Sequence, residues 1–230
     1  MKLTADDIAR MIDFSAVTGG TGDEQIDALI RDAKKHPFAA VMVPPCYVKQ
    51  VTEQLGGTPL TGTTIGFPSG ANTTETKVFE SRLALEQGAR ELDMVINVGA
   101  LLSGRYQYVE DDIRAVVDAA EGNCVKVILE VHFLDHDEIK KACELCIRAG
   151  AHFVKTATGW FSTGATGEHI ALMKTFVGDA IRIKASGGVR DLDTLITLHQ
   201  LGADRFGIST QAALNIVADC DALADDEVEI

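Results

Sequence analysis

The sequence predicts a closed (β/α)8 barrel, or TIM barrel, with a short N-terminal helix in front of it. Eight short β-rich runs alternate with amphipathic helical stretches along the 230 residues. Most of these runs are almost continuously apolar, which is typical of parallel strands covered on both faces. No low-complexity linker divides the chain, and no Gly-x-Gly-x-x-Gly follows the first run, as an open dinucleotide-binding sheet would favour. We therefore expect one barrel domain over residues 1–230, with an acidic tail from about residue 220 to residue 230.

The predicted strands are the runs bounded by turn-forming residues, because apolar and β-branched residues favour strands. A parallel strand must be followed by a crossover, and each run here is followed by a segment long enough to form one. In chain order the predicted strands are Ile12–Val17, Phe38–Val43, Leu60–Ile65, Leu92–Val98, Val125–Val131, His152–Thr156, Ile181–Lys184 and Ala203–Gly207.

The predicted helices are the segments with apolar residues at helical spacing. Ala5–Met11 would form the N-terminal helix and plug the bottom of the barrel. Asp23–Lys35 begins with an Asp that suits an N-cap, and Thr74–Gln87 ends before Gly88, which is typical of a helix C-terminus. The other predicted helices are the connection after Pro44-Pro45, Val109–Glu121, Asp137–Ala149, Gly167–Phe176, Asp191–Leu201 and Thr210–Ala218.

The composition excludes several classes of function. The hydrophobic content of 46% and the charged content of 24% are ordinary for a folded protein. A net charge of −13 argues against nucleic acid and anionic membranes as partners, and it requires any anionic substrate to be held by a locally positive pocket. The sequence has no apolar stretch of membrane-spanning length and begins without a signal-peptide core, so we expect a cytoplasmic protein.

The five cysteines give no pattern that predicts a metal site or a disulfide framework. Cys143 and Cys146 have C-x-x-C spacing, but they lie inside a predicted helix without a second Cys or His pair nearby. We expect reduced thiols and no metal or other cofactor.

Two lysines are the most informative residues of the chain. Lys155 and Lys184 each follow a short apolar run and precede a Gly-bearing turn. A buried ammonium group is costly unless it has a partner or a function. Two lysines on neighbouring strands would lower each other's pKa, which produces a neutral, nucleophilic amine. The pattern therefore predicts amine chemistry at the carboxyl ends of the sixth and seventh strands.

Other polar residues in the predicted strands extend this site, because barrel enzymes react at the C-terminal ends of their strands. Asp93 stands inside an apolar run, where an acid either pairs with a cation or has a raised pKa. Beside two inward lysines, proton transfer is its favoured role. Lys126 lies near the start of its strand, farther from the catalytic face, and is expected to be the structural partner of an acid. The remaining candidates are Asp13, Asn97 and Glu130.

Glycine-bearing loops after the seventh and eighth strands predict a phosphate site. Gly187-Gly188 and Gly207 each precede a predicted helix, and barrels that act on sugar phosphates commonly bind phosphate there through backbone N–H groups. Barrel turns also need glycine for purely structural reasons. The loop 159–166 contains the only Trp and is expected to form a lid or a wall of the site, or simply to cap the barrel rim.

Four segments resemble one family of enzymes. They are Phe153–Gly159 (FVKTATG), Ile183–Arg190 (IKASGGVR), Glu91–Asn97 (ELDMVIN) and Ile65–Gly70 (IGFPSG), and the resemblance extends in order over nearly the whole chain. On these motifs the sequence is similar to the deoxyribose-phosphate aldolases. The resemblance implies a metal-free class I aldolase on a (β/α)8 barrel. It would interconvert 2-deoxyribose 5-phosphate with acetaldehyde and glyceraldehyde 3-phosphate.

The resemblance also implies roles for individual residues. Lys155 corresponds to the Schiff-base lysine, Lys184 to the neighbour that lowers its pKa, and Asp93 to the proton-transferring acid. A small phosphorylated sugar is the implied partner, and a homodimer the implied assembly. The expected substrate and phosphate contacts are Asp13, Thr158, Gly187, Gly188, Gly207, Ser209 and Thr210.

Departures from the family pattern keep two alternatives open. The loops at 130–133, 160–163 and 207–211 differ from the common pattern, and the acidic tail has no Tyr. The bulky Trp160-Phe161 pair and Gln211 favour the same aldol chemistry on another deoxy-sugar phosphate or aldehyde pair. His132 and His136 are interpreted as loop histidines, with substrate contact by His132 as the alternative.

The other alternative is a phosphosugar-binding barrel without turnover. It would use Lys155 and Lys184 as structural cations paired with Asp93 and Glu130.

Overall fold

Eight parallel strands close into a barrel in chain order, and the predicted fold class is confirmed. The computed structural model describes residues 2–161, 164–223 and 227–229. The ring closes where β9 pairs with β2, with Gly207 in register with Asp13. The barrel strands are β2 (Ile12–Ser15), β3 (Ala40–Val43), β4 (Leu60–Ile65), β5 (Glu91–Val95), β6 (Cys124–Ile128), β7 (Phe153–Lys155), β8 (Arg182–Ser186) and β9 (Arg205–Ser209).

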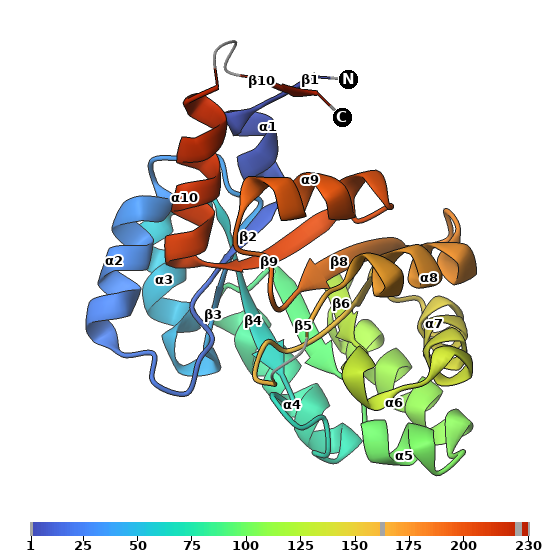
Figure 1. Cartoon of the computed structure of the whole chain (residues 1–230). Helices are drawn as coiled ribbons and strands as arrows, with labels where there is room; N and C mark the ends of the chain where they lie inside the picture. The colour runs from blue at the N-terminus through green and yellow to red at the C-terminus, as the bar shows by residue number, and fades with distance from the viewer. Residues whose placement is uncertain (1, 162–163, 224–226, 230) are drawn as a thin grey trace.

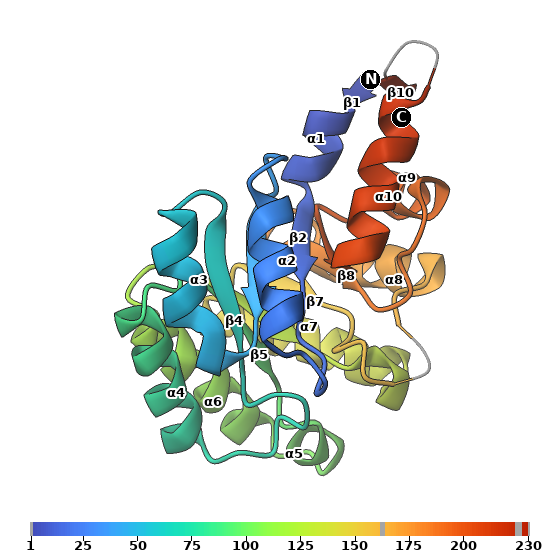
Figure 2. The ribbon, with the colours of Figure 1, turned by 90° about the vertical axis from the view of Figure 1, so that its left-hand side faces the viewer.

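Helices surround the barrel and cover its outer face (Figures 1 and 2). A continuous apolar core lies between strands and helices, and it includes a stacked pair of rings, Phe14 and Phe38, whose centroids are 4.4 Å apart. The helices are α1 (Ala5–Arg10), α2 (Asp23–Ala33), α3 (Val48–Leu55), α4 (Thr74–Glu86), α5 (Val98–Leu102), α6 (Tyr106–Ala119), α7 (His136–Ala149), α8 (Gly167–Val177), α9 (Leu192–Gln200) and α10 (Thr210–Asp221).

Several strands end at residues other than those predicted. β5 ends at Val95, since the Asn97 side chain accepts a hydrogen bond from the Ala100 N–H at 2.9 Å and starts α5. After β6, Glu130 has a φ of +56°, and a short 3-10 helix follows. We expected Lys184 at the end of its strand. Instead, β8 continues two residues past Lys184, so this lysine lies inside the strand.

The N-termini of two helices illustrate local capping. The Asp135 side chain accepts the Glu138 N–H at 2.9 Å, and the Glu138 carboxylate accepts the Asp135 N–H at 2.7 Å, which satisfies two otherwise unpaired donors. At α2 the expected N-cap, Asp23, is already in the first turn. Gly22 takes the cap position, and its N–H donates to the Gln25 side chain at 2.9 Å.

The two ends of the chain pair with each other, which the sequence did not indicate. β1 (Lys2–Thr4) and β10 (Glu227–Glu229) form an antiparallel ribbon, with Leu3 in register with Val228. The ribbon projects beyond the barrel next to α1 and α10, and both termini lie there (Figures 1 and 2). Part of the predicted acidic tail is thus helix and strand, while residues 224–226 and 230 lie outside the described residues.

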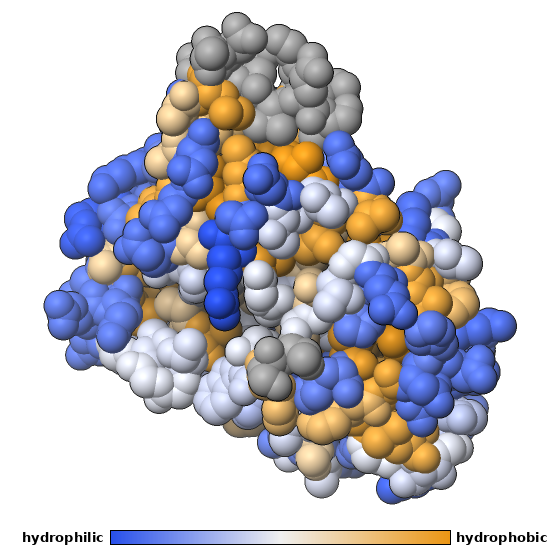
Figure 3. Space-filling view, in the orientation of Figure 1, coloured by the Kyte–Doolittle hydropathy of each residue, from blue (hydrophilic) through white to orange (hydrophobic). Residues whose placement is uncertain are grey.

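Hydrophilic residues occupy much of the surface seen in Figure 3, and apolar residues reach it in several separate groups. Such a mixture is ordinary for a folded protein. In the part of the chain that the structure describes, no helix is long and apolar enough to cross a membrane.

Candidate active site

The lumen of the barrel contains charged side chains, although branched apolar residues usually fill this space. Because side chains alternate along a strand, residues two apart share a face, and both Glu91 and Asp93 point inward from β5. Asp93 is in register with Lys126, and Lys155 with Lys184. The inward charged residues are Asp13 from β2, Glu91 and Asp93 from β5, Lys126 from β6, Lys155 from β7, Lys184 from β8 and Arg205 from β9.

Asp93 joins the two predicted lysines. Its Oδ2 lies 2.7 Å from Lys155 Nζ and 2.6 Å from Lys184 Nζ, while its Oδ1 lies 3.1 Å from Lys126 Nζ. The side chains of Asp93, Lys126 and Lys184 are wholly buried, and that of Lys155 is 5% exposed. The structure therefore brings together all three residues for which the resemblance implied catalytic roles.

A second acid, Asp13, neutralises the deeper part of the network. Asp13 pairs with Lys184, lies 3.1 Å from Lys126 Nζ, and accepts from Arg205 at 2.7 Å. Glu91 pairs with Lys126 and lies 3.5 Å from Arg205. Lys126 is thus the partner of acids, as predicted, and it has three of them.

The charges in this network do not balance. Four cationic side chains share three carboxylates among the described residues of the lumen. Lys126, Lys184 and Arg205 each pair with two or more acids, whereas Lys155 pairs with Asp93 alone. Loss of one proton would make the cluster neutral. Lys155 is the cation that can lose it with the least loss of ion pairing, because it has a single acid partner.

The pKa values follow this charge pattern. Burial lowers the pKa of Lys155 to about 8, with help from the nearby charges of Lys184 and Lys126 and against the attraction of Asp93. Burial opposes the ionised form of Asp93, but Lys126, Lys155 and Lys184 outweigh it and hold the pKa of this carboxyl well below its usual range. Asp93 is therefore an ionised acceptor next to an amine that can lose its proton near neutral pH.

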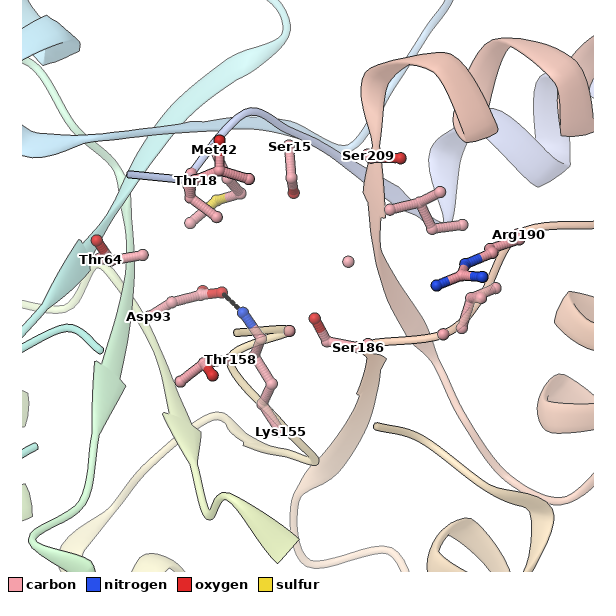
Figure 4. A pocket seen from close by; sticks show the side chains of 17 residues that line it. Ser15, Thr18, Met42, Thr64, Asp93, Lys155, Thr158, Ser186, Arg190 and Ser209 are labelled. Atoms are coloured by element: carbon pink, nitrogen blue, oxygen red, sulfur yellow. Dashed lines mark hydrogen bonds and ion pairs between the residues drawn. The ribbon is translucent and has the colours of Figure 1, made fainter. Parts of the chain in front are cut away.

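Lys155 and Asp93 reach an open pocket with a cavity volume of about 210 Å³. Figure 4 shows Asp93, Thr64 and Thr18 on one side of it, and Arg190 and Ser209 on the other. The pocket therefore has an amine end and an opposite end formed by the loops after β8 and β9. The predicted residues that line it are Asp93, Lys155, Thr158, Gly187, Gly188, Gly207 and Ser209.

Of the expected catalytic residues and substrate contacts, three do not line this pocket. Lys184 and Asp13 are buried beneath it in the ion network, and Thr210 follows Ser209 as the first residue of α10. Lys184 still touches the pocket indirectly, through the Asp93 oxygen that both lysines share. Substrate contact by Asp13 and Thr210 remains a prediction from the sequence.

The end remote from Lys155 is suited to an anion. Gly187 and Gly188 have φ values of +83° and +90°, which L-residues with side chains rarely adopt. Ser209 is the N-cap of α10, but its hydroxyl caps no backbone N–H and is exposed in the pocket. Arg190, which sequence reasoning missed, adds the second cationic side chain among the pocket's lining residues.

Gly207 has a packing role as well. A Cβ at this position would lie 2.7 Å from Ser186 Oγ and 3.1 Å from Lys184 Cε. The absence of a side chain at Gly207 therefore leaves room for buried Lys184. A structural reason for this glycine was the alternative to phosphate binding in the sequence analysis.

Two rim loops hold the segment that follows Lys155. The Thr158 N–H donates to both carboxylate oxygens of buried Glu130, at 3.2 and 3.3 Å. Glu130 Oε1 also lies 3.4 Å from His132 Nδ1, and the His132 ring packs 4.6 Å from the Phe161 ring. Neither Glu130 nor His132 lines the pocket.

The cysteines with C-x-x-C spacing do not line the catalytic pocket. Cys143 and Cys146 are buried on α7, and no cluster of three or more His, Cys, Asp or Glu suited to a metal occurs among the described residues. Burial raises the pKa of the Cys143 thiol to about 12.

Comparisons with known proteins show the family of this chain. Residues 6–210 match the model of the DeoC/LacD family aldolases. A deoxyribose-phosphate aldolase of Staphylococcus epidermidis is 49% identical over 202 residues, which are 87% of this chain and 92% of that protein. Deoxyribose-phosphate aldolase 2 of Staphylococcus aureus (strain COL) is 48% identical over 218 residues, covering 94% of this chain and 98% of that protein.

Solved structures share the architecture. A putative deoxyribose-phosphate aldolase from Coccidioides immitis superposes with a TM-score of 0.90 at 39% identity, over 94% of this chain and 86% of that one. A structure titled "QR15, an Aldolase" gives a TM-score of 0.88 at 36% identity, over 93% of this chain and 95% of that one. With a family model and relatives that each match most of its length, the chain belongs to the DeoC/LacD family of aldolases.

Proposed function

We propose that the chain cleaves 2-deoxyribose 5-phosphate reversibly to acetaldehyde and glyceraldehyde 3-phosphate through a Schiff base on Lys155. The relatives named deoxyribose-phosphate aldolase support the reaction. The observation that carries the mechanism is Lys155 itself, a buried amine at the pocket with one acid partner and a pKa lowered to about 8.

The lowered pKa decides how much nucleophile is present. At pH 7 about one in ten Lys155 side chains is neutral, compared with about one in three thousand at the ordinary lysine pKa. The neutral amine adds to the aldehyde carbon C1 of the open-chain sugar, and loss of water gives an iminium ion. The iminium withdraws electrons from the C2–C3 bond, which breaks as the C3 hydroxyl loses its proton.

Cleavage leaves an enamine on Lys155, which needs a proton at C2 before water can release acetaldehyde. Asp93 Oδ2 is 2.7 Å from Lys155 Nζ, within reach of the proton that the amine loses. Lys184 donates to the same oxygen at 2.6 Å from the buried side. Asp93 and Lys184 would move protons together, with a water molecule between Asp93 and the substrate carbon.

The substrate's phosphate would bind at the opposite end of the pocket. Backbone N–H groups at Gly187 and Gly188, the Ser209 hydroxyl and the α10 N-terminus favour an anion there. The Arg190 guanidinium supplies the charge that a protein of net charge −13 needs to attract a phosphate ester.

Replacing Arg190 with alanine is therefore expected to raise KM for 2-deoxyribose 5-phosphate by at least about tenfold, the effect of losing one charge-assisted hydrogen bond. The kcat should change little, because Arg190 lies at the end remote from the reacting bond. Steady-state rates on 2-deoxyribose, which lacks the phosphate, should be nearly the same for both proteins. Arg82→Ala on exposed α4 is the matched control. An equal loss on both sugars would contradict a phosphate contact.

Borohydride trapping tests the proposed function directly. The protein is incubated with 2-deoxyribose 5-phosphate, reduced with borohydride and digested, and its peptides are analysed by mass spectrometry. We expect a reduced two-carbon adduct on the peptide that contains Lys155, together with acetaldehyde and glyceraldehyde 3-phosphate in solution. Release of both products without an adduct would reject the Schiff base, and an adduct with no products from this sugar would reject the substrate.

Three further expectations from the sequence remain part of the proposal. They are a single barrel domain over residues 1–230, a cytoplasmic location and a homodimer. A deoxyribose-phosphate aldolase from Aeropyrum pernix is described as a tetramer; it is 29% identical to this chain with a TM-score of 0.86, over 96% of this chain and 94% of that one.

A further inference from the structure

Arg205 belongs to the ion network of the lumen but takes no part in the mechanism described above. It is the first residue of β9, at the end of the barrel opposite the catalytic pocket, and it does not line the pocket. Its side chain is only 15% exposed. A charged group that is mostly buried is costly unless it has partners or a function.

Two carboxylates and one aromatic ring surround the Arg205 guanidinium. Its Nη1 donates to Asp13 Oδ1 at 2.7 Å and lies 3.5 Å from Glu91 Oε2. Its central carbon lies 5.6 Å from the centroid of the Phe153 ring. Burial opposes the charge of Arg205, but Asp13 and Glu91 outweigh burial and raise the pKa of the guanidinium. Arg205 is therefore a permanent positive charge at the base of the lumen.

Neither carboxylate depends on Arg205 for a cationic partner. Asp13 pairs with Lys184 and lies 3.1 Å from Lys126 Nζ, while Glu91 pairs with Lys126. Without Arg205, the described residues of the lumen would include three paired lysines and three carboxylates, and their charges would balance. Arg205 is thus the source of the excess positive charge.

The other groups near Arg205 do not cancel this excess. Cys124 is in register with Glu91, and burial raises the pKa of its thiol to about 11, so the thiol is neutral. Arg182 and Asp204 lie at the start of β8 and just before β9, where both are exposed. Water screens exposed charges much more than buried ones, so these two contribute little inside the lumen.

The strand register connects Arg205 to the catalytic pocket. Lys184 is in register with Arg205 on one neighbouring strand and with Lys155 on the other. Neighbouring strands lie about 4.8 Å apart, so the backbones of Arg205 and Lys155 are about 10 Å apart. At an effective dielectric constant of about 20, a unit charge at about this distance changes a pKa by about 1.

Lys155 is the cation that responds to the excess charge. It pairs with Asp93 alone, and it is the only lysine that lines the pocket among the described residues. Burial lowers its pKa to about 8, and the charges of Lys184 and Lys126 add to this effect against the attraction of Asp93. A further positive charge in the lumen favours loss of the Lys155 proton, and a further negative charge favours its retention.

We propose that Arg205 is a positioning residue of the reaction, whose charge keeps Lys155 neutral and nucleophilic without contact with the substrate. Glu91 acts in the opposite direction, because its negative charge favours the protonated amine. Together these two residues at the base of the lumen set the pH range in which the protein works. The inference rests on the proposed Schiff-base function of Lys155.

Single variants of the two residues should move the pH profile of kcat/KM in opposite directions. Arg205→Met should raise the apparent pKa from about 8 to about 9, and Glu91→Gln should lower it to about 7. Relative to its own high-pH plateau, kcat/KM at pH 7 should fall about tenfold in Arg205→Met and rise about fivefold in Glu91→Gln. Dividing each variant by the parent protein at every pH removes the titration of the substrate's phosphate.

The double variant separates the effect of charge from damage to the fold. Arg205→Met with Glu91→Gln leaves three lysines and two carboxylates, so one positive charge is again in excess. Its apparent pKa should therefore return to about 8. Arg205→Lys keeps the charge and should keep the profile of the parent protein. Arg182→Met is the matched control, because it removes an exposed arginine at the same end of the barrel.

NMR gives a second measurement that does not depend on turnover. The lysines are labelled with 13C at Cε, and the signal of Lys155 is assigned by its loss in Lys155→Met. The midpoint of the Lys155 titration should move upward in Arg205→Met and downward in Glu91→Gln. It should stay in place in Arg205→Lys and Arg182→Met. If Arg205→Met does not fold, the midpoint in Glu91→Gln decides the question, and an unchanged value overturns the inference.

The outcomes distinguish this inference from the proposed function. Absence of a borohydride adduct on Lys155 with 2-deoxyribose 5-phosphate would reject the proposed function, whereas the NMR midpoints would still report how the two charges act on Lys155. A normal adduct with equal midpoints in the parent protein, Arg205→Met and Glu91→Gln would reject the role of Arg205 alone. Shifts of both single variants in the same direction, or a double variant that stays shifted, would also reject it.

Discussion

Replacing Lys155 with methionine is expected to lower kcat for 2-deoxyribose 5-phosphate cleavage by about ten-thousand-fold or more, as loss of a covalent nucleophile generally does. Methionine has nearly the same length as lysine but cannot form an imine. Asp93 keeps Lys126 and Lys184 as partners, so no buried charge is left unpaired. Steady-state rates and the absence of a borohydride adduct are the measurements.

The control for this variant is Lys49→Met, which makes the same change on the exposed part of α3. Thermal unfolding of both variants should resemble that of the parent protein. Residual turnover above about one per cent in Lys155→Met would show that another group performs the chemistry.

Replacing Lys184 with leucine is expected to reduce activity at pH 7 by about a hundred- to ten-thousand-fold, the range of one acid–base group. Two effects combine in this variant. The nearby charge of Lys184 lowers the pKa of Lys155, so its removal raises that pKa and leaves less neutral amine at pH 7. The variant also removes the donor to the oxygen of Asp93 that faces Lys155.

Lys126→Met is the matched comparison, because Lys126 also lowers the pKa of Lys155 but contacts the other oxygen of Asp93. Both variants should lose activity at pH 7, since the apparent pKa for imine formation moves upward from about 8. Above about pH 9 the amine becomes neutral again, and Lys126→Met should recover most of its rate. Lys184→Leu should stay slow at every pH. Full recovery of Lys184→Leu at high pH would limit its role to lowering the Lys155 pKa.

The parts of the site that the sequence predicted are those in which a charge interrupts an apolar run. Lys155, Lys184 and Asp93 stand out because each is a charged residue among apolar neighbours that are expected to be buried, and burying a charge is costly. Glu91 and Arg205 belong to the same ion network, yet each begins its strand directly after another charged residue, Arg90 or Asp204. Glu91 falls just before the predicted strand Leu92–Val98, and Arg205 lies inside the predicted strand Ala203–Gly207 without being singled out. Only the closed barrel shows that both side chains point inward.

Contacts between segments far apart in sequence were the other feature that the sequence did not predict. The ribbon of β1 and β10 joins segments from the two ends of the chain, and neither is long or apolar enough to predict a strand by itself. The catalytic pocket is likewise assembled from strand ends and loops that are far apart in sequence, so no single stretch contains its pattern. The barrel strands were predictable because each carries its own apolar run, although their ends depended on local groups such as Asn97 and Glu130.

The paired ends of the chain matter for how the protein is handled as a catalyst. Both termini lie on the ribbon of β1 and β10, beyond α1 and α10. The catalytic pocket opens at the other end of the barrel, where the strands reach Lys155 and Ser209. A tag or surface linker attached at either terminus would therefore leave the opening of the catalytic pocket facing the solution. Immobilised protein should retain the KM of the free protein, which makes the terminal ribbon a natural anchor for a flow reactor.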